Sequence, residues 1–117
     1  MSTPLPAVSV VIPTHQRPQF LRESVASVLG QTLAPAELVV VSDVPDEASR
    51  AIVEELAAGS KVKVTYLERD GVPGASASRN AGAHASTAPL VAFLDDDDRW
   101  LPIFLERTVA ALAEAEA

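Results

Sequence analysis

Cysteine is absent from the sequence, aromatic residues are few, and no long hydrophobic run occurs. With no cysteine in 117 residues, disulfides, thiolate catalysis and cysteine-ligated zinc are excluded. Aromatic residues form only 4% of the chain, so aliphatic residues and alanine must build the core. No stretch approaches the ~20 apolar residues of a transmembrane helix, and Met1–Pro6 lacks the basic and apolar parts of a signal peptide. We therefore expect a cytoplasmic protein without a transmembrane segment.

Basic residues are also scarce. The chain has 9 lysines and arginines against 16 aspartates and glutamates, which gives a net charge of −7. This balance argues against binding to nucleic acids or anionic lipids, because their phosphates would be repelled. It is compatible with a metal-dependent site, since a divalent cation would cancel part of the acidic charge. A length of 117 residues with 48% hydrophobic residues predicts a single domain over residues 1–117.

Four short apolar runs, rich in β-branched residues, alternate with segments whose apolar residues recur at helical spacing. The predicted strands are residues 8–12, 38–41, 62–67 and 90–94. The predicted helices are residues 18–30, 46–59, 75–85 and about 102 to the end. Such alternation is typical of right-handed βαβ units, so we expect a three-layer α/β/α fold with a mainly parallel sheet of about four strands. One face of the third strand is more polar than the other, so we expect this strand to lie nearer an edge of the sheet.

Polar segments follow three of the predicted strands, namely Thr14–Arg17, Ser42–Asp46 and Asp95–Asp98. In parallel α/β sheets, ligands bind beyond the C-terminal ends of the strands. We therefore expect the three segments to meet at one site. Receiver-like phosphoacceptors and aspartate-nucleophile phosphatases do not fit, because their paired acids follow the first strand, where this chain has Thr14.

Four adjacent aspartates, Asp95–Asp98, form the most unusual of these segments. Two carboxylates ~4 Å apart repel by about 4 kcal/mol at an effective dielectric constant near 20, so water or a bound cation must compensate. Oxygen ligands suit Mg²⁺ or Mn²⁺. Alternation along an extended segment would turn Asp95 and Asp97 to the same side, toward one cation. The alternative is a solvated acidic turn before the last helix.

The remaining polar residues each admit two interpretations. Arg79 lies in a helix of small residues, where it could reach a phosphate or form an ion pair with an aspartate. Thr14 and Asp43 end strands, and such residues are more often turn or capping residues than ligand contacts. His15 and His84 have no partner at metal-binding spacing, so we expect both to be structural or solvent-facing.

Five blocks in a fixed order make the chain resemble the N-terminal half of a family 2 glycosyltransferase with a GT-A-type fold. The blocks are Val8–Thr14, Ser27–Thr32, Glu37–Val41, Ser78–Gly82 and Ala92–Pro102. The last block contains the D-x-D motif of the family. Two positions depart from the family pattern. The chain has Ser42-Asp43 where two acids are usual, and His15-Gln16 where an aromatic residue and asparagine are usual.

The resemblance implies a nucleotide-binding role for the polar residues outside the acidic segment. Thr14 and Asp43 would contact the nucleotide base, which is usually uracil in the family. Arg79 would help to hold the base or the diphosphate. The family usually has two acids at the positions of Ser42 and Asp43. Because a serine replaces the first of them here, we expect the pocket for the base to differ from that of the family.

The acidic segment would be the D-x-D motif by the same resemblance. Asp95 or Asp96 would lie near the ribose of the nucleotide. Asp97 would bind the divalent cation, Mg²⁺ or Mn²⁺, with Asp95 on the same side. Asp98 is left over and is expected at the start of the last helix rather than as a ligand.

The implied activity is transfer of a sugar from a nucleotide-diphosphate sugar, with a UDP-sugar as the expected donor, to an acceptor hydroxyl. The catalytic base and the acceptor site of the family lie beyond the D-x-D motif, in a second half of comparable length. No catalytic residue can therefore be named in this chain. The alternative is a non-catalytic nucleotide-binding or regulatory module without the acceptor half.

The resemblance also implies the strand order third, second, first, fourth. In the family the fourth strand continues to further strands, whereas here it would form an edge with open backbone groups. We therefore expect the chain to form a homo-oligomer through that edge or through the last helix.

Overall fold

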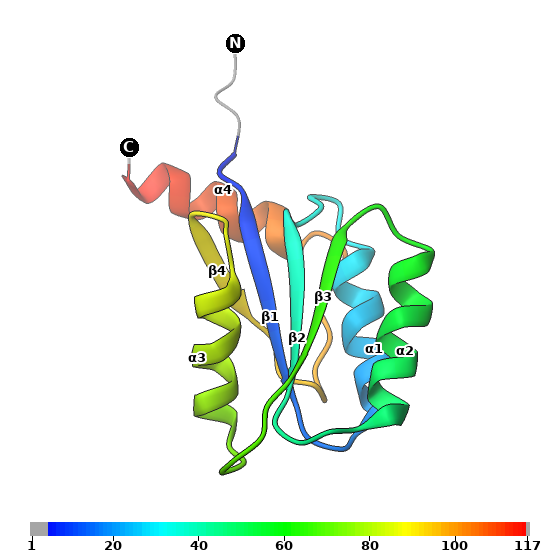
Figure 1. The fold of residues 1–117 in the computed structure, drawn as a ribbon. Coiled ribbons are helices and arrows are strands. Elements are labelled where there is room, and N and C mark those ends of the chain that lie inside the picture. Colours follow the sequence, from blue (N-terminus) through cyan, green and yellow to red (C-terminus); the bar gives the residue numbers. More distant parts are fainter. Residues whose placement is uncertain (1–4, 117) are drawn as a thin grey trace.

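The computed structural model describes residues 5–116, in which four strands alternate with four helices (Figure 1). The strands are β1 (Val8–Thr14), β2 (Glu37–Ser42), β3 (Lys63–Glu68) and β4 (Leu90–Phe93). The helices are α1 (Pro18–Leu29), α2 (Glu47–Ala58), α3 (Ala75–Ala85) and α4 (Phe104–Glu116). None of the helices described here is both long enough and apolar enough to cross a membrane.

The four strands form one parallel sheet in the order β3-β2-β1-β4. This confirms the parallel α/β fold, the predicted strand order and the position of β3 at an edge. Figure 1 shows α3 on one face of the sheet and the other helices on the opposite face. Both central strands are buried along their whole length, which agrees with their continuous apolar sequences.

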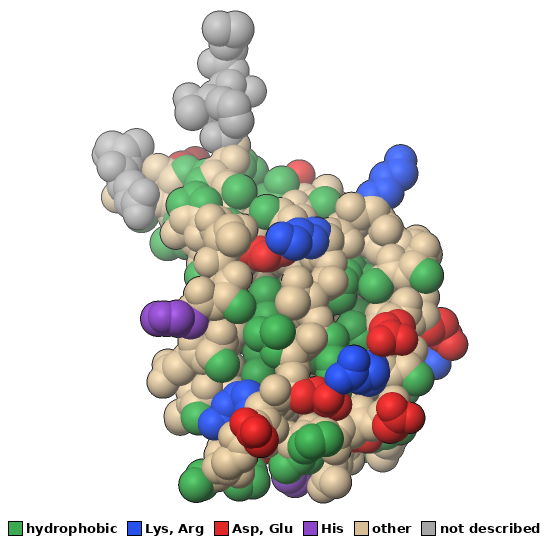
Figure 2. All heavy atoms as spheres, viewed as in Figure 1, with side chains coloured by type: hydrophobic (Ala, Val, Ile, Leu, Met, Phe, Trp, Pro, Cys, Tyr) green, Lys and Arg blue, Asp and Glu red, His purple; other side chains and the backbone are tan. Residues whose placement is uncertain are grey.

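The two faces of the sheet bury separate clusters of side chains. One face packs Val10 and Ile12 of β1 against α1, α2 and α4, and it holds most of the buried residues. The opposite face packs Val11 of β1 with residues of β2 and α3. Because a single helix covers this second face, hydrophobic side chains remain visible beside α3 in Figure 2.

Helix α3 approaches the sheet closely because Gly82 has no side chain. A Cβ atom at this position would lie 2.3 Å from Cγ1 of Val11, which is buried in β1. Real atoms do not approach so closely, so any larger residue would push the helix away from the strand. The short separation brings the first turns of α3 over the C-terminal end of β1, beside the polar segments.

Strand β1 continues through Pro13, whereas the sequence predicted that it would end there. In this strand the carbonyl of Val11 accepts a hydrogen bond from the backbone N–H of Leu94, so residues 11 and 13 face β4. The ladder between β1 and β4 ends at the pair Val11 and Phe93. Pro13 therefore lies beyond the end of the β1–β4 ladder, where its missing N–H group costs no hydrogen bond to β4.

Helix α4 begins at Phe104, not at about residue 102, so the expected position of Asp98 at the helix start is wrong. The helix start is set by Gln31, which follows α1. Its side-chain amide donates to the carbonyl of Leu101 at 2.7 Å, and its side-chain oxygen accepts from the N–H of Leu105 at 2.9 Å. This contact satisfies an N–H of the first helical turn from outside the helix.

A buried carboxylate joins the strands at the end of the sheet opposite the polar segments. Glu37, at the start of β2, accepts hydrogen bonds from the hydroxyl of Ser9 at 2.6 Å and from the hydroxyl of Thr87 at 2.8 Å. The hydroxyl of Ser9 also accepts from the N–H of Ala88. These bonds hold the loop before β4 against β1 and β2, and thereby support the register of β4.

These contacts make the free energy of unfolding depend on pH through Glu37. The hydrogen bond from Ser9 and the bonds from Thr87 lower the pKa of Glu37, against the opposing effect of burial. A lowered pKa stabilises the fold above the pKa of the unfolded chain, about 4.3, and this contribution is lost as the pH falls below that value. We expect Glu37→Gln to destabilise the protein by about 1–3 kcal/mol at pH 7 and to reduce the loss of stability between pH 5 and pH 3.

Urea denaturation at several pH values measures both effects. The matched control is Glu55→Gln, since Glu55 pairs with Arg22 at the surface and its pairing is screened by solvent. Equal pH profiles for Glu37→Gln and the wild-type protein would show that the Glu37 carboxylate contributes no linkage.

Candidate functional site

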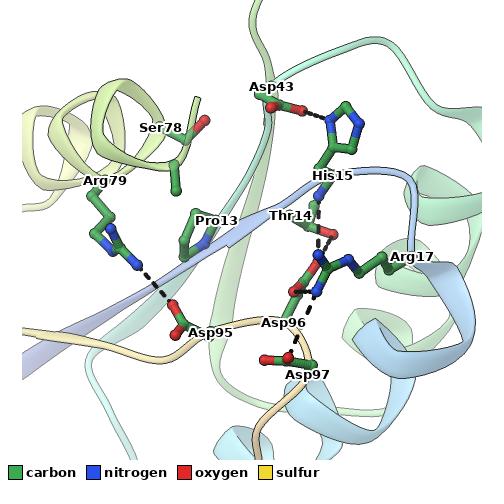
Figure 3. A pocket seen from close by; sticks show the side chains of 11 residues that line it. Pro13, Thr14, His15, Arg17, Asp43, Ser78, Arg79, Asp95, Asp96 and Asp97 are labelled. Atoms are coloured by element: carbon green, nitrogen blue, oxygen red, sulfur yellow. Dashed lines mark hydrogen bonds and ion pairs between the residues drawn. The ribbon is translucent and has the colours of Figure 1, made fainter. Parts of the chain in front are cut away.

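A pocket of about 250 Å³ lies where β1, β2 and β4 end and α3 begins (Figure 3). It is lined by Pro13, Thr14, His15, Arg17, Asp43, Ala75, Ser78, Arg79, Asp95, Asp96 and Asp97. All six residues for which the sequence predicted a nucleotide or metal contact therefore lie around one cavity. The roles of the individual residues stay predictions.

Asp96 is turned into the protein, and only 6% of the residue is exposed. One carboxylate oxygen accepts hydrogen bonds from the hydroxyl of Thr14 at 2.9 Å and from the backbone N–H of His15 at 3.3 Å. The hydroxyl of Thr14 is therefore used inside the protein, on Asp96. The pair ties the end of β1 to the loop after β4, as Figure 3 shows.

The backbone of the acidic loop is curled around Ser24 of α1. The buried Ser24 hydroxyl lies within hydrogen-bonding reach of the carbonyl oxygens of Asp95, Asp96 and Asp98. A hydroxyl group offers one proton, which these three acceptors must share. The loop backbone is thus fixed against α1, and the residues Asp95, Asp97 and Asp98 are exposed, in contrast to Asp96.

Two arginines offset part of the negative charge. Arg79 of α3 donates to Asp95 at 2.9 Å, so its guanidinium forms the ion pair that was one of its two predicted alternatives. Nη1 of Arg17 lies 3.4 Å from an oxygen of Asp96 and 3.6 Å from an oxygen of Asp97. The repulsion among the aspartates is thus reduced by two cations of the protein itself.

The exposed acids can also bring oxygen ligands together for a divalent cation. One carboxylate oxygen each from Asp95, Asp97 and Asp98 lies within 4.8 Å of the other two. Acidic oxygens are ligands that Mg²⁺ and Mn²⁺ prefer, and small rotations of these exposed side chains would bring the three oxygens onto one cation. Asp98 belongs to this set, although the sequence placed it outside the site, whereas the buried Asp96 does not belong to it.

Asp43 is held by the protein on both carboxylate oxygens. One oxygen lies 2.6 Å from Nδ1 of His15, and the other accepts a hydrogen bond from the N–H of Gly74, just before α3. The His15 ring is about half exposed and lines the pocket. Asp43 therefore fixes two walls of the cavity, which is a structural role in addition to any contact with a ligand.

Sequence reasoning did not nominate His15 or Arg17 as site residues. His15 was expected to be structural or solvent-facing, and its half-exposed ring bonded to Asp43 agrees with that expectation. Its position directly after Thr14, at the end of a central strand, was the signal that it would also line the site. Arg17 carried only the weaker signal of a basic residue between a strand and a helix. His84 lies on the same helix as Arg79 but does not line this pocket.

A second hollow of about 440 Å³ adjoins the first and shares Arg79 and Asp95 with it. It is lined by Arg79, Phe93, Leu94, Asp95, Asp98, Arg99 and Trp100. The Trp100 ring stacks on Phe104 with the ring centroids 4.6 Å apart, which fixes one wall. The acidic loop therefore separates two cavities and contributes residues to both.

The sequence profile described as Glycosyl transferase family 2 matches residues 9–117 of the chain. An uncharacterized glycosyltransferase from Nostoc sp. is 38% identical over 104 residues, which cover 87% of this chain and 31% of the relative. Validoxylamine A glucosyltransferase from Streptomyces hygroscopicus is 36% identical over 111 residues, 93% of this chain and 24% of the relative. The chain thus spans less than a third of the length of these two proteins.

Solved structures show the same fold. S. aureus TarS 1-349 in complex with UDP-GlcNAc superposes with a TM-score of 0.75 and 28% identity, over 92% of this chain and 31% of that protein. A mannosyltransferase from Pyrobaculum calidifontis, solved with GDP-Man and Mn²⁺, superposes with a TM-score of 0.78 over 93% of this chain and 32% of that protein. At 23% identity the second likeness shows the fold alone.

The burial difference between neighbouring aspartates predicts effects of unequal size on stability. We expect Asp96→Asn to destabilise the protein by about 2–4 kcal/mol, because the buried group would lose the charge that strengthens its bonds from Thr14 and His15, and its NH₂ group would face Arg17 where the carboxylate has an acceptor. The side chain of Asp97 is 53% exposed, so Asp97→Asn should change stability by less than about 0.5 kcal/mol. Urea denaturation at pH 7 measures both values, and equal losses would contradict the division of the cluster into buried and exposed acids.

Proposed function

The chain belongs to glycosyl transferase family 2, and we propose that its pocket binds a nucleotide-diphosphate sugar through a divalent cation, for transfer of the sugar to an acceptor hydroxyl. The observation that carries this proposal is convergence. Residues from three strand ends and from α3 meet around one cavity, next to a cluster of carboxylate oxygens suited to a cation. Transfer is a property proposed for the whole protein, because this chain spans less than a third of the two relatives described above.

The two adjoining hollows give the donor a direction. The nucleoside would occupy the pocket lined by Thr14, His15 and Asp43. The sugar would extend into the hollow beside Trp100. Since Arg79 and Asp95 line both cavities, the diphosphate would pass from one cavity to the other beside these two residues. The Arg79 guanidinium could then exchange its ion pair with Asp95 for the phosphate oxygens.

A divalent cation would be held by Asp97 and Asp95, with Asp98 as the third acid of the cluster. When bound, Mg²⁺ or Mn²⁺ supplies Lewis acidity that offsets the negative charge on the departing diphosphate. The protein contributes the position of these acids. Ser24 turns the loop backbone inward, and the buried Asp96 anchors it to Thr14.

A UDP-sugar is the donor that we propose first. S. aureus TarS was solved with UDP and with UDP-GlcNAc, and it shares the fold of this chain at 28–29% identity. Asp43 is the acid nearest to the position proposed for the base, where it would accept from an N–H group of uracil. Its existing bonds to His15 and Gly74 mean that the base must share or displace one of them.

Titration calorimetry with UDP tests the donor site. We expect UDP to bind in the presence of Mn²⁺ and the binding heat to disappear when EDTA removes the metal. Asp97→Asn should weaken metal-dependent UDP binding at least about tenfold, because it removes a charged ligand of the cation. The matched control is Glu54→Gln, an exposed acid on α2 whose loss changes the net charge equally. An absence of metal-dependent heat with any nucleoside diphosphate would overturn the proposal.

We also propose that the chain self-associates through β4. This strand pairs only with β1 within residues 5–116, so its other edge has open backbone groups. Val91 and Phe93 of β4 are exposed on the face that carries α3. Pairing of this edge between two copies would satisfy the backbone groups and cover both side chains.

Sedimentation velocity at tens of micromolar tests the self-association. We expect a dimer that Val91→Glu converts to a monomer, because a charged side chain next to the open edge opposes pairing. Val72→Glu is the matched control, since Val72 is exposed in a loop away from β4. A wild-type protein that sediments as a clean monomer would contradict the proposal.

A further inference from the structure

Arg17 occupies a position between the buried and the exposed parts of the acidic cluster. It lies just before the first residue of α1, and its side chain is 49% exposed. Its Nη1 atom is 3.4 Å from the buried Asp96 and 3.6 Å from the exposed Asp97. Figure 3 shows the guanidinium extending over both carboxylates at the mouth of the pocket.

The two contacts of Arg17 differ in how easily another ion could replace the arginine. Asp96 is held in place by hydrogen bonds from Thr14 and from the backbone of His15, so it offers Arg17 a rigid partner. Asp97 has only the distant contact with Arg17 among the ion pairs of the described residues. At a separation of 3.6 Å, between groups that are each about half exposed, an ion pair contributes little and is easily exchanged.

Asp97 is also one of the three acids whose oxygens could hold a cation. Arg17 and a divalent cation would therefore compete for the same carboxylate. We propose that Arg17 is a resident counter-ion that neutralises Asp97 before metal binds, and that it turns to the diphosphate once the metal has taken its place. This inference rests on the proposed donor site and assigns a positioning role to a residue that the sequence did not single out.

The chemistry of the guanidinium suits both states. Its planar fork can bond two oxygens of a carboxylate or of a phosphate, and it stays charged throughout. The Asp96 contact keeps the side chain beside the pocket during the exchange, because Asp96 is held in place by other bonds. Arg79 differs, since its contact with Asp95 is a close 2.9 Å hydrogen bond and its side chain lies on the opposite wall.

The two roles predict opposite changes when the charge is removed. In Arg17→Gln, the competing cation is lost, so Mn²⁺ alone should bind about three- to tenfold more tightly, the range for a unit charge a few ångströms away in a hydrated site. UDP in saturating Mn²⁺ should bind about tenfold more weakly, because one charge-assisted contact to the diphosphate is lost. Arg17→Lys, which keeps the charge, should leave the Mn²⁺ affinity near that of the wild type.

Calorimetric titrations with Mn²⁺ alone, and then with UDP in saturating Mn²⁺, measure both changes. The control is Arg22→Gln, which removes the same charge from α1 but from an ion pair with Glu55. Circular dichroism and thermal unfolding establish that each variant is folded. Tighter Mn²⁺ binding in Arg17→Gln than in the wild type and in Arg22→Gln, together with weaker UDP binding, supports the inference.

Other outcomes separate this inference from the donor site. If the wild type and Arg17→Gln bind Mn²⁺ with the same affinity, the proposed role of Arg17 is overturned and the proposed donor site is unaffected. Weaker binding of both Mn²⁺ and UDP in Arg17→Gln shows that the side chain only supports the loop, and also overturns it. If neither protein binds Mn²⁺, the metal site and the inference fail together, whereas Mn²⁺ binding by Arg17→Gln alone supports the competition.

Discussion

Repulsion among four adjacent carboxylates is the constraint on which the end of the sheet depends. Neighbouring charges of this kind oppose one another by several kcal/mol unless they are separated or neutralised. The fold separates one acid from the others and places two arginines beside the cluster, whereas one oxygen each from Asp95, Asp97 and Asp98 still lies within 4.8 Å of the other two. Asp96 is buried against Thr14 and His15, while the other three acids are exposed on a loop whose backbone is held against α1 by Ser24. One acid thus serves as an anchor, and its neighbours remain available to solvent and to ligands.

The anchoring of the loop connects packing to the proposed chemistry. Gly82 lets α3 lie close to β1, and this places Arg79 opposite Asp95 across the pocket. Arg17 neutralises the other wall from the start of α1. The arginine contacts are only partly buried, so each can be exchanged for a phosphate or a cation at modest energetic cost. A site that is balanced by exchangeable ion pairs can remain folded both with and without its ligand.

The strands, their parallel direction and the convergence of the polar segments followed from local patterns, whereas the strand order came from the family resemblance. Continuous β-branched runs indicated buried strands, and parallel strands bring their C-terminal ends to one edge. The errors arose where a distant side chain decides the local structure. Gln31 sets the start of α4, so Asp98 is not a helix-start residue. Pro13 does not end β1, because the pairing of β1 with β4 already ends at Val11, before Pro13 would have to donate a hydrogen bond to β4.

Periodicity and the order of the elements were enough to predict that carboxylates, a threonine and an arginine meet at one end of a parallel sheet. Which carboxylate is buried and which are exposed could be learned only from the folded protein. Four identical neighbours carry no local signal that distinguishes them. Their environments differ because Thr14 and Ser24, more than 70 positions away in the chain, contact particular atoms of the loop. Such contacts depend on the three-dimensional packing of β1, α1 and β4, which no short stretch of sequence encodes.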